Sequence, residues 1–194
     1  MFKTLYLIAA GTIMLASCQQ KAETTTSGTG TISQDSLIKR GNYLVTMMAC
    51  TDCHTPKKMG PHGPEPDPAL LLSGHPAGLP LAKIDTTATK DWAMTNMNNT
   101  AWVGPWGVSF TANLTPDETG IGSWTEAQFF KAIREGKSKG LDNTRPLLPP
   151  MPWPSYAQAS DDDLRAIFAY LKSIKPVKNV VPQPIPPTQL ASLK

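Results

Sequence analysis

The spacing of apolar residues along the chain predicts three helices. Apolar side chains recur every three or four residues over 36–49, 125–135 and 160–174, which is the period of an amphipathic helix. Thr125 and Ser160 stand where the last two segments begin, and both residue types favour the N-cap position. No stretch alternates apolar and polar residues in the manner of a strand. We therefore expect an all-α fold of about three main helices joined by long irregular loops.

Two of the predicted helices are expected to pack together. The first contains Gly41, and a glycine inside a helix costs stability unless it allows a neighbour to approach closely. The segment 160–174 carries an apolar stripe and is the expected neighbour. We place the folded domain at 35–176. Residues 57–109 form a connection inside it far longer than ordinary loops between helices, and 177–194 form a proline-rich tail that we expect to run as extended surface chain.

The first residues have the features of an export signal. Lys3 supplies a positive start, and the apolar stretch Leu5 to Ala16 follows. Twelve helical residues span about 18 Å, which is too short to cross a bilayer. We expect residues 1–17 to be a signal peptide.

The end of this signal resembles the lipobox of bacterial lipoproteins in the run Leu15-Ala16-Ser17-Cys18. That resemblance implies cleavage before Cys18 and a lipid on its thiol, which would anchor the chain on the periplasmic side of a bacterial membrane. The alternative is an ordinary secretory signal followed by a chance cysteine. Residues 18–34 are rich in Thr, Ser and Gly and are expected to form a flexible tether.

The run Cys50-Thr51-Asp52-Cys53-His54 is the most specific motif in the chain. Its thiols lie one helical turn apart and can reach the two vinyl groups on one edge of a haem, while the adjacent histidine lies under the iron. We predict one covalent haem c held by Cys50 and Cys53, with His54 as an axial iron ligand. With Cys18 lipidated, no cysteine remains for a disulfide.

The second iron ligand is less evident from the residues alone. Met151 lies between prolines at 149, 150 and 152, and such a stiff loop can hold a thioether without helix or sheet contacts. The alternative role for Met151 is to fill a gap in the core. The other candidate ligands are His62 and His75 and the methionines Met59, Met94 and Met97. Met47 and Met48 lie on the helix that carries the cysteines, on the wrong side of the haem, and are expected in the core.

The order of these features resembles that of class I cytochromes c, in which a first helix leads to C-x-x-C-H and a proline-flanked methionine precedes a final helix. Residues 110–124 and 148–156 are similar to parts of larger bacterial monohaem domains, which occur alone or as cytochrome subunits of periplasmic dehydrogenases. The resemblance covers residues 36–182 and implies Met151 as the distal ligand. Residues 57–104 depart from the compact class I pattern.

The haem pocket is expected to draw on residues of these similar segments. They are Phe110, Asn113, Leu114, Trp153 and Tyr156. For Asn113 the alternative is a turn role ahead of Thr115, and Trp153 and Tyr156 would otherwise pack in the core. We expect His54 to donate its second ring N–H to a backbone carbonyl. Pro61, Pro64 and Pro66 are candidate sources of that carbonyl.

The charge distribution indicates protein partners and no nucleic acid. The net charge is only +3 and no basic block is present, which argues against nucleic-acid binding. Five basic residues could form a weak positive collar that steers an acidic redox partner, although such side chains are more often simply solvated. They are Lys57, Lys58, Lys137, Lys139 and Arg145.

Three classes of function remain open. A His/Met pair fills both axial positions of the iron, which favours a membrane-tethered electron carrier that serves a dehydrogenase, an oxidase or another cytochrome by outer-sphere transfer. A labile Met151 would instead allow a haem enzyme or a gas or peroxide sensor. A thiol redox or zinc protein is the third class. It is disfavoured because redox C-x-x-C pairs sit at helix starts, whereas this pair follows a helical segment, and because zinc requires further ligands.

Overall fold

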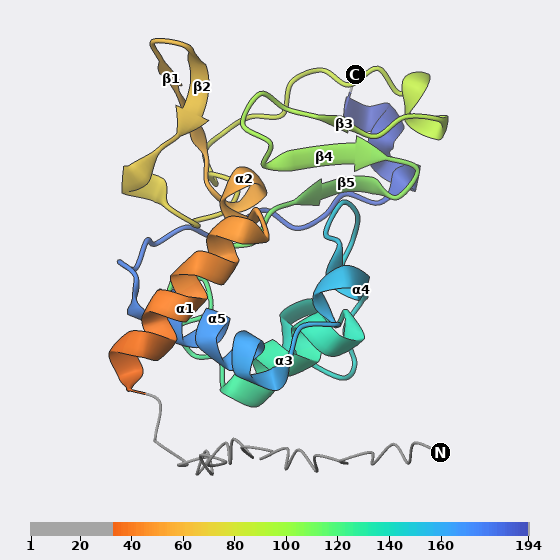
Figure 1. Ribbon diagram of the computed structural model, residues 1–194. Helices are drawn as coiled ribbons and strands as arrows, with labels where there is room; N and C mark the ends of the chain where they lie inside the picture. The colour runs from red at the N-terminus through yellow and green to blue at the C-terminus, as the bar shows by residue number, and fades with distance from the viewer. Residues whose placement is uncertain (1–32, 194) are drawn as a thin grey trace, which may run out of the picture. The chain divides into compact units, whose positions relative to one another are not determined.

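The computed structural model describes residues 33–193 and contains the three predicted helices (Figure 1). They are α1 (Gln34–Met47), α3 (Glu126–Glu135) and α5 (Asp161–Ser173). Thr125 and Gln128 form a reciprocal capping box at the start of α3, and Gly136 ends that helix with φ of 63°. The Ser160 hydroxyl caps α5 by accepting from the Asp163 amide. Local sequence signals therefore located these helices correctly.

The first and last helices cross at Gly41, as its position predicts. A Cβ at this residue would overlap the backbone of Ala166 and lie 2.7 Å from Cβ of Tyr170. The main core forms around this contact and consists of seven buried residues. They are Val45, Leu72, Ile121, Phe129, Leu164, Ile167 and Leu171.

The C-x-x-C-H motif does not continue the first helix. Ala49 adopts left-handed backbone angles with φ of 56° and separates α1 from the short helix α2 (Cys50–His54). The expected helix over 36–49 thus ends two residues early, and Cys50 begins a separate short helix.

The expectation of an all-α fold is wrong, because the long segment between α2 and α3 contains two small antiparallel sheets. Strands β1 (Lys57–Gly60) and β2 (Gly63–Pro66) form a hairpin. Strands β3 (Met94–Thr95), β4 (Ala101–Gly104) and β5 (Gly107–Phe110) form a three-stranded sheet in that order. These strands span two to four residues, which is too short to show the alternation that identifies a strand in sequence.

A second core lies under the three-stranded sheet and is closed by the end of the chain. Val103 and Val108 pack there with Leu190, which lies in η4 (Pro187–Leu193), a 3-10 helix. Ile185 pairs with Val108 through two backbone hydrogen bonds of 2.8 and 3.0 Å. The tail is therefore integrated into the sheet region, because its apolar residues have a core to join.

The remaining elements are short. They are the 3-10 helices η1 (Pro68–Leu70), η2 (Ala88–Lys90) and η3 (Ser138–Gly140), and α4 (Trp153–Tyr156). Within residues 33–193, no helix has the length and apolarity that crossing a membrane would require. The predicted signal peptide, most of the predicted tether and Cys18 lie outside the described residues.

Candidate haem-binding site

The two cysteines of the motif lie on α2 and are both free and partly exposed. Burial raises the pKa of the Cys50 thiol to about 11. Burial also raises the pKa of Cys53, and the carboxylate of Asp52 adds to that effect. The structure corrects one step of the sequence argument, because the pair does lie at the start of its own short helix. The raised thiol pKa values nevertheless oppose the thiolate that disulfide exchange requires.

The His54 ring is held in one orientation by a backbone carbonyl that lies just after the long segment 57–109. Its Nδ1 lies 2.8 Å from the carbonyl oxygen of Ala112. A carbonyl can only accept, so Nδ1 carries the proton and donates. The pKa of His54 is lowered by burial, with the Ala112 bond acting in the opposite direction. The ring is therefore neutral near pH 7, and Nε2 keeps the lone pair that iron ligation needs.

The expected backbone acceptor for His54 exists, but none of the three prolines supplies it. Residues 72–75 pack against the segment around Ala112 and hold it in place. His75 donates its backbone N–H to the Thr111 carbonyl at 2.9 Å, and Gly74 donates to the carbonyl of His54 at 2.8 Å. A Cβ on Gly74, whose φ is 78°, would lie 2.5 Å from the carbonyl carbon of Ala112. This close packing fixes the acceptor relative to α2.

Met151 is half-buried in a loop that is tied to β5. The Ser109 hydroxyl donates to the Pro149 carbonyl at 2.6 Å, and Trp106 Nε1 donates to the same hydroxyl at 3.2 Å. Sequence reasoning missed both residues, since an isolated serine and tryptophan in a Gly/Pro-rich stretch carry no signal of this contact.

The helix that follows Met151 contacts the region of α2 directly. The Tyr156 hydroxyl donates to the carbonyl of Met48 at 2.6 Å, two residues before Cys50. The pKa of Tyr156 is raised first by burial and then by the charges of Cys50, Cys53 and Asp52. The Met151 loop and the C-x-x-C-H helix therefore belong to one neighbourhood, although about 100 residues separate them in sequence.

The other predicted pocket residues have defined partners within the protein. Asn113 is buried, and its side chain accepts from the Thr115 amide and donates to the Val177 carbonyl, which favours its turn role. Trp153 packs against Gly136. Phe110 lies 4.8 Å from the His75 ring, centroid to centroid, and Leu114 packs on the main core.

The alternative axial ligands are placed differently from Met151. His62 is exposed at the turn between β1 and β2, whereas His75 is fully buried with Nδ1 3.0 Å from the Thr100 hydroxyl. The side chains of Met59 and Met97 are 78% and 77% exposed, so they face solvent. Exposure therefore argues against His62, Met59 and Met97, whereas the buried Nε2 of His75 has no hydrogen-bond partner within residues 33–193.

The predicted basic collar divides into two groups. Lys137 and Arg145 lie on adjacent chain segments, since the Ser138 amide donates to the Arg145 carbonyl at 3.0 Å and Lys137 pairs with Pro146. Lys58 instead forms an exposed ion pair with Glu65 at 3.9 Å. Lys57 turns its ammonium onto the end of α2.

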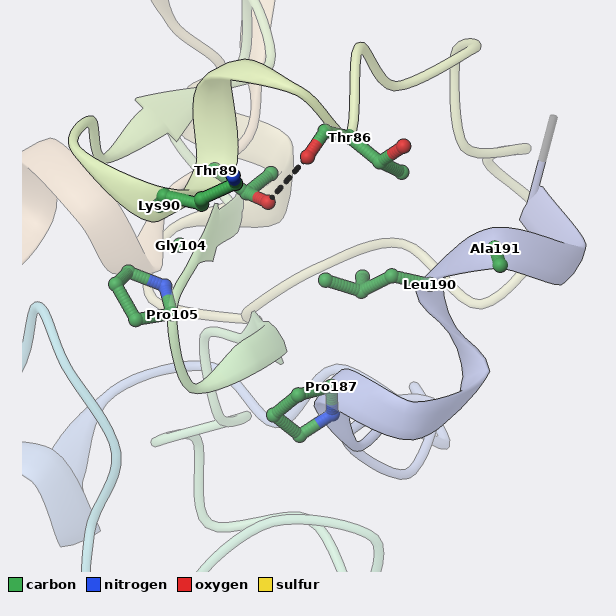
Figure 2. Close-up of a pocket in the computed structure, with 8 residues that line it drawn as sticks. All are labelled: Thr86, Thr89, Lys90, Gly104, Pro105, Pro187, Leu190 and Ala191. Carbon is green, nitrogen blue, oxygen red and sulfur yellow. Dashed lines mark hydrogen bonds between the residues drawn. The ribbon is translucent and has the colours of Figure 1, made fainter.

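A shallow pocket elsewhere on the protein has no part in this arrangement. It has a volume of about 520 Å³ and lies between η2, the β4–β5 turn and η4 (Figure 2). Lys90, Pro105 and Leu190 are among its lining residues, which include no Cys, His or Met. The donors that suit haem c are instead those on and around α2. Two thiols one turn apart and a neutral imidazole with Nε2 available fit that group.

Comparison with known proteins points in the same direction. No family model matches the chain. It is 33% identical over 147 residues to the gluconate 2-dehydrogenase cytochrome c subunit of Pantoea cypripedii, which covers 75% of this chain and 25% of that protein. It is 31% identical, with coverages of 75% and 23%, to the cytochrome c subunit of the quinone alcohol dehydrogenase of Gluconobacter oxydans.

A third relative extends over nearly the whole chain. The fructose dehydrogenase cytochrome subunit of Gluconobacter japonicus is 28% identical and covers 97% of this chain and 31% of its own length. This chain therefore spans only about a quarter to a third of the curated relatives described here. The relatives are cytochrome subunits of dehydrogenases, and their similarity supports a cytochrome c domain in this chain and implies haem c as its cofactor.

Proposed function

We propose that this chain is a monohaem c-type cytochrome that carries single electrons between redox proteins. The observation that carries the proposal is the state of His54, whose Nδ1 donates to Ala112 at 2.8 Å while Nε2 stays available beside two free thiols. Bound haem c supplies a one-electron ferric/ferrous couple. Residues of this chain would hold the cofactor, ligate its iron and contact the redox partner.

Cys50 and Cys53 would hold the cofactor through thioethers, and His54 and Met151 would supply its iron ligands. The bond to Ala112 fixes the orientation of the imidazole and increases its basicity. Ser109 holds the carbonyl of Pro149, two residues before Met151. A methionine kept in place by its loop leaves no open position for a substrate, which favours outer-sphere electron transfer over chemistry at the metal.

The electron would enter or leave at the side of α2 that faces solvent. Cys53 is partly exposed, so the thioether edge that it holds would be accessible to a docked protein. Lys137, Lys139 and Arg145 precede the Met151 loop in the sequence and would favour an acidic partner surface. The three relatives described above are named as cytochrome subunits of dehydrogenases, and we propose a dehydrogenase as the electron donor.

The location follows from the sequence features outside the described residues. Export through a signal over 1–17, a lipid on Cys18 and a tether over 18–34 would keep the cytochrome domain over 35–176 near a membrane on its periplasmic side. Cys18→Ser is expected to release the protein from the membrane fraction while the haem spectrum stays the same. A variant that stays fully membrane-bound would contradict the lipid anchor and leave the cytochrome assignment intact.

The central experiment is expression of the full chain with a c-type maturation system, followed by optical spectroscopy. We expect one haem per chain that resists acid–solvent extraction, with a low-spin ferric spectrum that includes the sulfur-to-iron charge-transfer band. Met151→Ala should abolish that band and lower the reduction potential, because the thioether favours ferrous iron. Met97→Ala is the matched control, since that side chain is 77% exposed.

Each alternative outcome identifies a different error. Retention of the band in Met151→Ala would reject Met151 as a ligand. A high-spin resting spectrum of the wild type would favour the sensor or enzyme reading, in which Met151 is labile. Absence of covalent haem would overturn the cytochrome proposal itself.

A further inference from the structure

Lys57 directs its positive charge at the carboxyl end of the C-x-x-C-H helix. Its Nζ donates to the carbonyl oxygens of Asp52 and Thr55 at 2.8 and 2.9 Å and lies 3.5 Å from that of Thr51. The last carbonyls of a helix have no partners within it and carry partial negative charge. One ammonium therefore satisfies the end of α2 immediately after His54.

The ammonium is partly removed from water in this position. Lys57 is half-buried, and burial lowers its pKa while Asp52 raises it. A half-buried charge is screened less by solvent and salt than an exposed one. Lys58, the next residue, provides the contrast, because its ammonium is exposed and lies 3.9 Å from the Glu65 carboxylate.

A residue from the long central segment holds the Lys57 backbone in place. The Lys57 N–H donates to the side-chain oxygen of Asn98 at 2.8 Å, and Asn98 lies between β3 and β4, 41 residues further along the chain. Lys57 faces Pro66 across the hairpin, and a proline has no N–H of its own to contribute to the ladder. Asn98 thus connects the long segment to the end of α2.

We propose that Lys57 is a potential-setting residue that stabilises the ferrous state, and that Asn98 is the positioning residue that holds it. The inference rests on the proposed function and gives a role to part of the segment that departs from compact class I cytochromes. Reduction lowers the positive charge at the haem by one unit. A nearby fixed cation therefore opposes the ferric form more than the ferrous form, while the uncompensated carbonyls of α2 would act in the opposite direction.

The test is spectroelectrochemical titration of the intact holoprotein and its variants. At an ambient potential equal to the wild-type midpoint, we expect Lys57→Gln to lower the ferrous-to-ferric ratio by about threefold or more, because removal of a half-buried cation beside α2 favours the ferric state. Lys57→Arg should keep most of the wild-type value because it keeps the charge. Lys58→Gln removes the same charge from the next residue and should leave the ratio within about 1.5-fold of wild type.

Asn98→Ala tests the positioning step. It should shift the ratio in the same direction as Lys57→Gln but less, and should add little in the double variant, because both changes act through one charge. Additive shifts would reject Asn98 as the positioning residue. If Lys57→Gln does not accumulate as holoprotein, an unshifted Asn98→Ala protein overturns the inference, and a negative shift supports it.

The readouts separate this inference from the function on which it rests. A wild type without covalent haem overturns both. Covalent haem with its charge-transfer band retained, together with a Lys57→Gln midpoint equal to that of Lys58→Gln, overturns the role of Lys57 alone. A purely structural Lys57 would lower thermal stability in Lys57→Gln and Lys57→Arg alike without separating their midpoints.

Discussion

The hydroxyl of Ser109 donates a 2.6 Å hydrogen bond to the carbonyl of Pro149, and this contact joins β5 to the loop that carries Met151. The same hydroxyl accepts from Trp106 Nε1 at 3.2 Å, so one side chain and one backbone carbonyl share this buried oxygen. The loop between Pro149 and Pro152 has little regular structure of its own. This long-range bond and the local bond from the Met151 amide to the Leu148 carbonyl at 3.2 Å therefore both contribute to its position.

Ser109→Ala should loosen the Met151 loop without removing the methionine. Loss of the hydrogen bond is expected to cost about 1 kcal/mol. The charge-transfer band of the ferric protein should therefore disappear at a lower temperature than in the wild type. Ser155→Ala is the control, because the hydroxyl of Ser155 has no hydrogen-bond partner within residues 33–193. Identical melting of the band in both variants would show that Ser109 does not position the loop.

Gly41→Ala should destabilise the contact between α1 and α5. The new methyl group would overlap the backbone of Ala166, and overpacking of this kind costs about 1–3 kcal/mol. Chemical denaturation should record that loss of unfolding free energy. Gly78→Ala is the matched change, since a Cβ there meets no atom within 4 Å, and it should be neutral or slightly stabilising.

Tyr156→Phe should weaken the connection between α4 and the residue before the haem motif. The hydroxyl donates to Met48 at 2.6 Å, and its removal leaves a carbonyl that must find water, at a cost of about 1 kcal/mol. Tyr170→Phe removes a hydroxyl for which no partner occurs among residues 33–193. If the two variants unfold at the same denaturant concentration, the Met48 contact does not contribute.

His75 should make the protein less stable in mild acid. Its pKa is lowered by burial, so the folded protein resists protonation of this ring while the unfolded chain accepts a proton below about pH 6.5. The unfolded state then binds more protons, and stability falls as the pH drops below that value. Between pH 7.5 and 5.5, the wild type should lose up to about 1.4 kcal/mol more than His75→Gln. Equal losses would indicate that the ring titrates alike in both states.

The sequence predicted the parts of the fold that depend on local pattern. Thr125, Gln128 and Ser160 indicate where helices start, because capping hydrogen bonds link residues three positions apart. Gly41 predicts a helix crossing because a glycine inside a helix costs stability unless its missing side chain lets a neighbouring helix approach closely. The strands could not be recognised in the sequence because they are short and rich in Gly or Pro. Strand β3 has two residues, and β1, β2, β4 and β5 have four each.

The candidate site was predictable in its reactive groups and unpredictable in its supports. A cysteine, histidine or methionine can be recognised as a candidate for haem attachment or iron ligation from its residue type. The Ala112 carbonyl that orients His54 does not, because every residue carries a carbonyl and this one lies 58 residues away. The left-handed turn at Ala49 could not be predicted either, since alanine ordinarily favours a helix.

The pairing of Ile185 with Val108 joins the end of the chain to β5 across 77 residues of sequence. Contacts of such wide sequence separation form late in folding, because the loop between them must close first. The second core therefore closes only after the segment that follows α5 is available, whereas α2 is built from five consecutive residues. If haem is attached during the export proposed above, the thiols of Cys50 and Cys53 would be accessible in an open chain before Ile185 completes the sheet.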